Sequence, residues 1–499
     1  MNSSELYAAY VTKMQQIADI KYASAVLQWD QETYLPPKGN QFRGRQIATL
    51  NEQAHLLFAK EKTGTLLTEL MGCEDLTIKQ KQNVALSFYD YTRAKKFSGD
   101  FVRKMSEATS KTFHAWIQAR KENSFTFFEK PLEELINLKK QEADTLGYTD
   151  HPYSALMNDY DRGLNVSIAD KVFADLKPQL KKLLAVIESR SQVDDTFLHK
   201  SYNKDKQWEF GIEILKRIGF DFEAGRQDIS EHPFTINFNN KDVRITTRID
   251  ENDFTNMTWS CIHEGGHALY EQGLPGEEYG LPLGEYCSLS IHESQSRLWE
   301  NNIARGLPFW QNNFSLLQTF FPNQFAAISV EQFYRAINKV SPSLIRTEAD
   351  EITYHFHIMI RYEIEKMLIN GTIKTADIPG YWNSHYKEYL DVTVPDDKNG
   401  CLQDVHWSHG SLGYFATYSL GSLYAAQLYA AFTKGNESIE KEIAAGNNNM
   451  VVKWLKENIY EYGRFYTSEE LCKKATGETL NSTHFIRYAN EKFSKIYQF

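Results

Sequence analysis

The chain has 499 residues, and its 55 lysines and arginines stand against 65 aspartates and glutamates, which gives a formal net charge of −10. The basic residues form no block, so the charge pattern excludes a protein that binds nucleic acid through phosphate contacts. Hydrophobic residues at 42% and charged residues at 24% indicate an ordinary folded protein and exclude disordered and collagen-like classes.

The beginning of the chain reads as an amphipathic helix, because residues 1–20 have no continuous apolar core behind a basic start. A signal peptide is therefore not predicted. The five cysteines are scattered and form no C-x-x-C pair, which suits reduced thiols. We expect a cytoplasmic protein.

Apolar residues recur at three- and four-residue spacing along much of the chain, which is typical of amphipathic helices. This spacing predicts long helices at residues 4–28, 39–58, 78–97, 100–121, 131–146, 168–190 and 205–218. The chain shows no internal repeat and no linker long enough to separate independent domains. We expect a mainly α protein with one large helical body over residues 1–499.

Residues 234–249 break the helical pattern, because apolar and polar residues alternate there on both sides of an Asn-Asn turn. This alternation predicts a β-hairpin. Val243, Ile245 and Thr247 share one face of its second strand, and Arg244 lies on the opposite, polar face. A lone hairpin needs a surface to pack against.

An uncharged stretch at residues 410–433 is long enough to cross a bilayer. Its many tyrosine, serine and threonine hydroxyls need polar partners, which lipid does not supply. We expect a helix buried inside the protein and no membrane contact.

The strongest chemical signal is His263-Glu264-Gly265-Gly266-His267, which lies in a helical pattern. Positions i and i+4 share a helix face, so the two imidazoles can bind one zinc ion, and Glu264 lies where it can take a proton from water. Composition alone predicts about 0.05 such matches in a chain of this length. Each glycine costs the helix about 1 kcal/mol relative to alanine, so we expect another helix to approach closely here.

A third ligand is expected on a second helix at residues 289–300, which returns antiparallel to the first. Glu293 lies 26 residues after His267, far enough for a turn and a returning helix. His292 is the rival ligand, and a surface salt bridge is the alternative role for either residue. We favour Glu293, because two histidines and a glutamate form a known ligand set of hydrolytic zinc.

HEGGH followed by HESQSR at this distance resembles the carboxypeptidase Taq family of zinc metallocarboxypeptidases. Further segments look like signatures of that family in the same order: WDQETYLPP (29–37), HPF (232–234), DVRIT (242–246), IRTEAD (345–350) and GCLQDVHW (400–407). Leu35 is the clearest variation, because members of the family often have methionine there.

This resemblance implies a saddle-shaped, almost all-helical fold with zinc on the floor of a deep groove that helical subdomains flank. It also implies a cytosolic enzyme, commonly a homodimer, that removes the C-terminal amino acid from peptides with broad side-chain tolerance. Cobalt and manganese stay open as alternatives to zinc, since affinity order alone does not select the metal in a cell.

A carboxypeptidase must bind a free carboxylate, which favours an arginine near the metal. We expect Arg346 in this role, at the start of a long helix running toward Asn370, where the helix dipole also attracts anions. A salt bridge to Asp350 is the alternative role for Arg346. Arg244 on the hairpin is the second candidate.

Hydrogen-bond donors are needed where oxyanion charge develops. We expect Tyr418 and His409 to donate there, because the His…Tyr…Tyr order resembles that of related helical zinc peptidases. His406 and Tyr414 from the same region, and His232 from the HPF segment, are expected to contact the substrate. A separate metal pair formed by His406 and His409 is the alternative.

Two other functions fit the pattern. One is a zinc oligopeptidase that cuts internal bonds of short peptides with the same zinc site. The other is a non-catalytic helical scaffold with structural zinc, although no cysteine spacing offers the thiolates usual in such sites.

Overall fold

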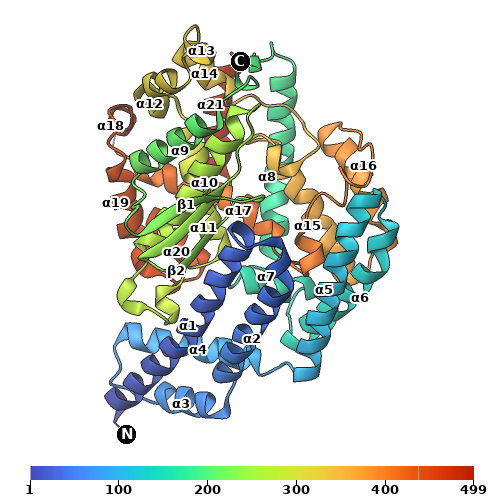
Figure 1. Ribbon diagram of the computed structural model, residues 1–499, viewed down its shortest axis with the longest axis vertical. Helices are drawn as coiled ribbons and strands as arrows, with labels where there is room; N and C mark the ends of the chain where they lie inside the picture. The colour runs from blue at the N-terminus through green and yellow to red at the C-terminus, as the bar shows by residue number, and fades with distance from the viewer. Residues whose placement is uncertain (1, 436–437) are drawn as a thin grey trace. The chain divides into compact units, whose positions relative to one another are not determined.

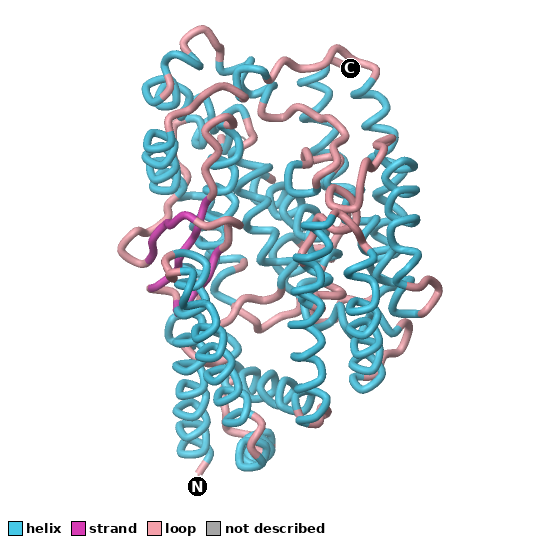
Figure 2. The backbone as a smooth tube through the Cα atoms, turned by 45° about the vertical axis from the view of Figure 1, so that its right-hand side comes forward, coloured by secondary structure: helices cyan, strands magenta, loops and turns pink. Residues whose placement is uncertain are grey.

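The computed structural model describes residues 2–435 and 438–499. Its described residues form two compact units. The first unit comprises Met1–Lys95, Asp194–Ile337 and Leu428–Thr479, and the second comprises Lys96–Val193, Asn338–Gln427 and Leu480–Phe499. Figure 2 shows helices along most of the described chain and a single small group of strands. The prediction of a mainly α fold with a small sheet is confirmed, while the single-domain organisation stays a prediction.

All seven helices predicted from apolar spacing are present. They are α1 (Ser3–Thr33), α2 (Asn40–Phe58), α4 (Ile78–Ala94), α5 (Gly99–Glu122), α6 (Thr126–Leu146), α8 (Val166–Glu188) and α9 (Lys204–Ile218). The largest differences from the predicted bounds are five residues: α1 extends beyond residue 28 to Thr33, and α6 starts five residues before Pro131. Phe128 and Leu132 are buried there, so packing of the first turns outweighs the backbone bond that the proline removes.

The remaining helices of the first unit are shorter, apart from the one that carries the HEGGH segment. They are α3 (Glu61–Met71), α10 (Phe254–Gly273), α11 (Leu289–Arg297), α12 (Leu307–Phe320), α13 (Pro322–Phe325), α14 (Val330–Ala336), α18 (Ile439–Ala444), α19 (Asn449–Asn458) and α20 (Ser468–Thr476).

The second unit adds α7 (Pro152–Tyr160), α15 (Tyr354–Asn370), α16 (Ile378–Leu390) and α21 (Thr483–Tyr497) to α5, α6 and α8. The uncharged stretch forms α17 (Phe415–Thr433), and its hydroxyl residues Thr417 and Ser419 are buried. Within the described residues, no helix is both long and apolar enough to cross a membrane.

The predicted hairpin is present, and it belongs to a three-stranded sheet in the order β1-β3-β2. β2 (Thr235–Asn239) and β3 (Asp242–Thr247) are antiparallel, whereas β1 (Gly225–Ile229) pairs with β3 in parallel. Strand β1 was not predicted, because its sequence GRQDI has no apolar alternation. Its Gly225 is required by close packing, since a Cβ atom there would lie 2.2 Å from the Val243 carbonyl oxygen.

Both faces of the sheet are covered by helices of the first unit, as Figure 1 shows around α10 and α1. Val243 and Ile245 are fully buried on the face that packs against α10. On the other face, the Arg244 guanidinium lies 4.3 Å from the ring centre of Trp29 on α1. The partner surface that the hairpin needs is therefore α10 on one side and α1 on the other.

Candidate metal centre

The helix that carries HEGGH is fixed at both of its ends. At the N-terminus the Asp253 side chain accepts a hydrogen bond from the Thr255 backbone, and Phe254 is fully buried among the aromatic rings of Tyr202, Phe321 and other residues. At the C-terminus a Cβ atom on Gly273 would lie 2.3 Å from the Tyr460 ring. These contacts hold α10 in one position along its axis.

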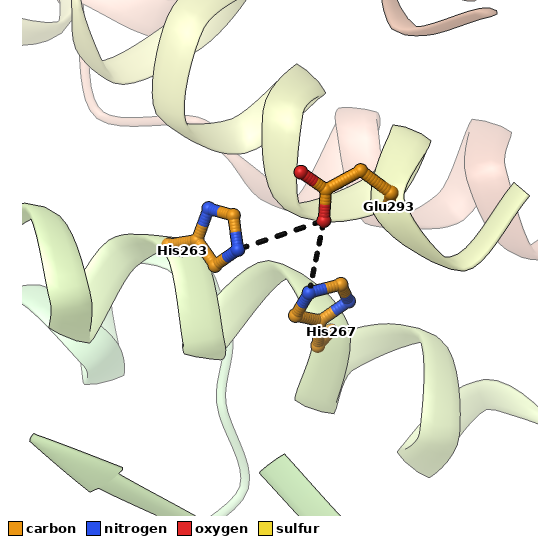
Figure 3. A group of neighbouring side chains, drawn as sticks. All are labelled: His263, His267 and Glu293. Carbon is orange, nitrogen blue, oxygen red and sulfur yellow. Dashed lines mark ion pairs between the residues drawn. The ribbon is translucent and has the colours of Figure 1, made fainter. Parts of the chain in front are cut away.

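Three ligand atoms converge beside α10 (Figure 3). The Nε2 atoms of His263 and His267 lie 3.7 Å and 3.4 Å from the same carboxylate oxygen, Oε2 of Glu293. Ligand atoms about 2.1 Å from a tetrahedral zinc ion lie about 3.4 Å apart, so this spacing fits a single metal ion. Among the described residues, these three side chains form the one group of histidine, cysteine and carboxylate ligands with metal-binding geometry.

α11 runs antiparallel to α10, as predicted from the 26-residue interval. Successive residues of α10 contact residues progressively earlier in the segment of α11 and the turn that follows it. His263 bonds Glu300, His267 lies beside Glu293, and Glu271 bonds His292. The antiparallel prediction is therefore confirmed.

The two glycines of the motif face different neighbours. A Cβ atom on Gly266 would lie 2.7 Å from the backbone of Gln295 and Ser296, so this glycine permits the close approach of α11 that the sequence predicts. A Cβ atom on Gly265 would lie 2.8 Å from side chains of α9, which can move more easily than backbone. Gly266 is thus the residue that brings the third ligand to the two histidines.

His263 has a charged hydrogen-bond partner on its other ring nitrogen. Its Nδ1 lies 2.9 Å from Oε2 of Glu300, which sits in a π-helical turn (Leu298–Ala304) that continues α11. Arg297 contacts both Glu300 and Oε1 of Glu293, and Arg305 contacts the second oxygen of Glu300. Such a carboxylate fixes the imidazole tautomer that leaves Nε2 free to bind a metal.

Glu300 was not among the residues predicted from the sequence, although a signal was present. Glu300 lies seven residues after Glu293, and this interval returns to nearly the same face of a helix. The π-helical turn that contains Glu300 could not be predicted, because its sequence has no distinguishing periodicity.

His292 lies outside the converging group. Its Nε2 atom lies 2.8 Å from Oε1 of Glu271, and its ring stacks on His267 with ring centres 4.4 Å apart. Glu271 also accepts a hydrogen bond from the Asn237 amide of β2. The geometry therefore places Glu293, and not the rival His292, beside both imidazoles.

The ionisation of the three candidate ligands reflects their burial and their neighbours. Burial lowers the pKa of His267 to about 3, so its imidazole is neutral at pH 7. Although burial opposes it, the Arg297 guanidinium and the His263 imidazole hold the pKa of Glu293 well below its usual range. Burial also opposes protonation of His263, but Glu293 and Glu300 raise its pKa. A metal cation bound to Nε2 would compete with a proton on that nitrogen.

Glu264, the candidate general base, is buried on α10. Its Oε2 atom accepts a hydrogen bond of 2.6 Å from the Thr235 hydroxyl of β2. Burial raises the pKa of this carboxyl, and the Thr235 hydrogen bond partly opposes that change.

Arg346 lies in the second unit, in a short 3-10 turn (Arg346–Glu348). The prediction that it starts the long helix is wrong, because α15 begins only at Tyr354, so the dipole of that helix does not act at Arg346. Its partner is not Asp350, which instead accepts hydrogen bonds from the Thr353 backbone and hydroxyl.

The guanidinium of Arg346 is buried and binds Asp404. Nε and Nη2 lie 2.9 Å and 2.8 Å from Oδ1 of Asp404, while Oδ2 accepts a hydrogen bond of 2.5 Å from Arg361. Although burial opposes it, the two guanidinium groups hold the pKa of Asp404 well below its usual range. Two arginines share one carboxylate, so this cluster keeps a positive charge.

Two of the predicted substrate residues, His406 and Tyr414, and the predicted oxyanion donor Tyr418 lie beside this cluster. Arg346 lies 5.0 Å from the ring centre of Tyr418, whose hydroxyl lies 3.2 Å from Nε2 of His406. The rings of Tyr414 and Tyr418 are 5.0 Å apart. Burial and the nearby Arg346 lower the pKa of His406 to about 3, so His406 is neutral at pH 7.

The other predicted residues do not join these groups. His409 is exposed and its ring contacts Phe113 on α5, 4.9 Å away. His232 in the first unit is also exposed. Arg244 makes two hydrogen bonds of 2.9 Å with Asp242 and lies between aromatic rings, so its charge is already balanced.

A mainly helical protein in which two histidines and a glutamate surround one point, beside a buried second glutamate, has the ligand set of a metal-dependent hydrolase.

The comparisons with known proteins narrow this class. A family model described as carboxypeptidase Taq (M32) metallopeptidase matches residues 9–493. The chain is 36% identical to carboxypeptidase 1 of Bacillus subtilis (strain 168), over 97% of each chain. It is 35% identical to thermostable carboxypeptidase 1 of Thermus thermophilus, over 100% of each chain.

A solved structure agrees with these sequence matches. The M32 carboxypeptidase of Deinococcus radiodurans R1 superposes with a TM-score of 0.97 at 35% identity, and the match covers 99% of this chain and 100% of that one. The chain belongs to the carboxypeptidase Taq (M32) family of metallopeptidases, and it is a metallocarboxypeptidase that hydrolyses peptides.

Proposed function

We propose that the protein is a zinc-dependent carboxypeptidase that removes the C-terminal residue of peptides with broad specificity. The observation that carries this proposal is the convergence of His263, His267 and Glu293, whose ligand atoms all lie within 4.8 Å of one another. Neutral imidazoles and a carboxylate suit zinc, and cobalt or manganese are the alternatives. A bound metal ion would polarise the scissile carbonyl and lower the pKa of a water molecule.

Glu264 is the general base in this proposal. Its Oε2 atom is held by the Thr235 hydroxyl, which leaves Oε1 to accept a proton from the attacking water. The same carboxyl then donates this proton to the leaving amine nitrogen. Burial raises the pKa of this carboxyl, and a raised pKa suits such a cycle because it makes the carboxylate a stronger base toward water.

Arg346 binds the terminal carboxylate of the peptide in this proposal. Asp404 engages Nε and Nη2 of Arg346, so Nη1 is the group assigned to the substrate. The positive charge left by two arginines on one aspartate favours an anion. Tyr418 and His409 are proposed as hydrogen-bond donors to developing oxyanion charge, whereas His406, Tyr414, Arg244 and His232 are proposed to contact the substrate.

We also propose a cytoplasmic homodimer. The family resemblance favours this assembly and location, and the five cysteines, none of which forms a disulfide bond, suit a reducing compartment. Light scattering of the purified protein tests the dimer directly.

The decisive experiment incubates the metal-loaded protein with a free-ended peptide and with its C-terminally amidated twin, and identifies the products by mass. Stepwise loss of single residues from the free end, together with resistance of the amidated peptide, is the expected result. Equal internal cleavage of both peptides would show an oligopeptidase with the same metal centre.

A further inference from the structure

We propose that Thr235 on β2 is a positioning residue for Glu264. The inference rests on the proposed role of Glu264 as general base. The Thr235 hydroxyl donates to Oε2 of Glu264 at 2.6 Å and also lies 3.1 Å from the backbone carbonyl oxygen of the same residue. A hydroxyl has one proton, so the shorter contact to the carboxylate is the main hydrogen bond.

This hydrogen bond stands alone at the carboxylate. Among the described residues, Thr235 is the only one whose side chain donates to Glu264. No arginine or lysine pairs with Glu264 in the described part of the chain, in contrast to Glu293 and Glu300, which both contact Arg297. The orientation of the proposed base therefore depends on one hydroxyl.

The backbone of Thr235 is well placed to hold that hydroxyl still. Thr235 pairs with Ile245 in the sheet, and the adjacent Phe234 exchanges hydrogen bonds with Thr246 through both its N–H and its carbonyl oxygen. The side chain of threonine is β-branched, which restricts its χ1 angle. A rigid strand thus carries the donor, as a precisely oriented catalytic carboxylate requires.

The chain offers a matched control on the neighbouring strand. Thr247 of β3 is buried, and its hydroxyl lies 2.6 Å from the Ser260 hydroxyl of the same helix, α10. Thr247 and Thr235 therefore both link the sheet to α10, but only Thr235 contacts a carboxylate. Replacing either hydroxyl by a methyl group removes one strand-to-helix hydrogen bond of similar length.

The experiment compares Thr235→Val, Thr235→Ser and Thr247→Val in the metal-loaded enzyme. Thr235→Val should lower kcat about 10- to 100-fold, because a small misplacement of a catalytic group costs about that much, with KM changed less than about threefold. Bound metal and the melting temperature should match those of Thr247→Val. Thr235→Ser, which keeps the hydroxyl, should restore most of kcat.

The outcomes separate this inference from the proposed function. Full activity of Glu264→Gln would remove the general base itself, and with it the proposed mechanism. Full activity of Thr235→Val beside an inactive Glu264→Gln would overturn the positioning role alone. Metal loss in Thr235→Val, or an equal fall of kcat in Thr247→Val, would also overturn it, because the hydroxyl would then serve only the packing of the sheet on α10.

Discussion

In the first unit, the Nε2 atoms of His263 and His267 lie 3.4–3.7 Å from one oxygen of Glu293, a spacing that suits a shared metal ion better than direct hydrogen bonds. In the second unit, Arg346 and Arg361 bind Asp404 directly, at 2.9 Å and 2.5 Å. The first group has ligand atoms that need a cation, whereas the second has balanced most of its own charge. A metal site can thus be recognised from ligand atoms that converge on one point. An anion site must instead be recognised from the positive charge that remains after the ion pairs within the site are counted.

The largest expected effect tests the ligand set of the first unit. Glu293→Ala should abolish stoichiometric metal binding, because it removes one of three ligand atoms, whereas His292→Ala should lower metal content little. Metal analysis of both purified variants measures this. The reverse ranking would reassign the third ligand to His292, and a modest loss in His292→Ala is expected, since its ring stacks on His267.

The next effect concerns turnover without metal loss. Glu264→Gln should keep its metal and lose about 10²- to 10⁴-fold in kcat, because the amide has nearly the same shape and cannot accept the proton. Kinetics beside metal analysis of the same sample decide this. A metal-free variant would instead identify Glu264 as a ligand.

The charge cluster of the second unit should matter only for substrates with a free end. Breaking one side of a buried charge pair costs about 2–5 kcal/mol, so Arg346→Ala should lower kcat/KM for a free-ended peptide by about 30-fold or more. The amidated twin, already a poor substrate, should change little. Equal losses for both peptides would make Arg346 structural, and Arg244 would become the leading candidate for the terminal carboxylate.

A smaller effect sharpens the description of the metal centre. Glu300→Gln should weaken metal affinity about 10- to 100-fold, because His263 loses its charged orienting partner. Glu271→Gln is the matched control, since Glu271 bonds His292, which is not among the converging ligands. Competition with a chromogenic chelator measures both variants. Equal losses would show that the His292 stack supports the centre as strongly as Glu300 does.

The sequence sufficed for those parts of the molecule that local periodicity encodes. The i, i+4 histidines and the seven long helices follow from regular spacing, and the returning helix with Glu293 follows from the interval after His267 and the known ligand set of zinc. Strand β1 could not be predicted from the sequence, because its pairing with β3 depends on the fit of Gly225 against Val243 and not on an alternation of apolar residues. The partner of Arg346 could not be predicted either, since Asp404 lies 58 residues further along the chain and no local pattern joins the two residues.

The charge cluster of the second unit has a buried neighbour that titrates near neutral pH. Glu365 on α15 is fully buried and accepts hydrogen bonds from Tyr153, from Nε1 of Trp407 at 2.7 Å and from the Gly413 backbone at 2.8 Å. Burial raises its pKa to about 7, although these donors oppose the change. Glu365 thus anchors Trp407 and Gly413, which both follow His406 along the chain.

The smallest expected effect follows from this pKa. The folded protein binds the Glu365 proton more tightly than the unfolded chain, whose carboxyl has a pKa near 4.5, so this stabilisation is fully present below pH 4.5 and is lost as the pH rises through 7. The loss is at most about 3.5 kcal/mol, at about 1.4 kcal/mol per pH unit between the two values. Urea unfolding of the parent and of Glu365→Gln between pH 5 and pH 8 measures it. The free energy of unfolding should fall more steeply with pH in the parent than in the variant, whose amide does not titrate. Parallel curves for the two proteins would mean that the three donors already keep Glu365 ionised at pH 5. The second unit would then hold two buried carboxylates in their charged form, Glu365 through hydrogen bonds and Asp404 through its two arginines.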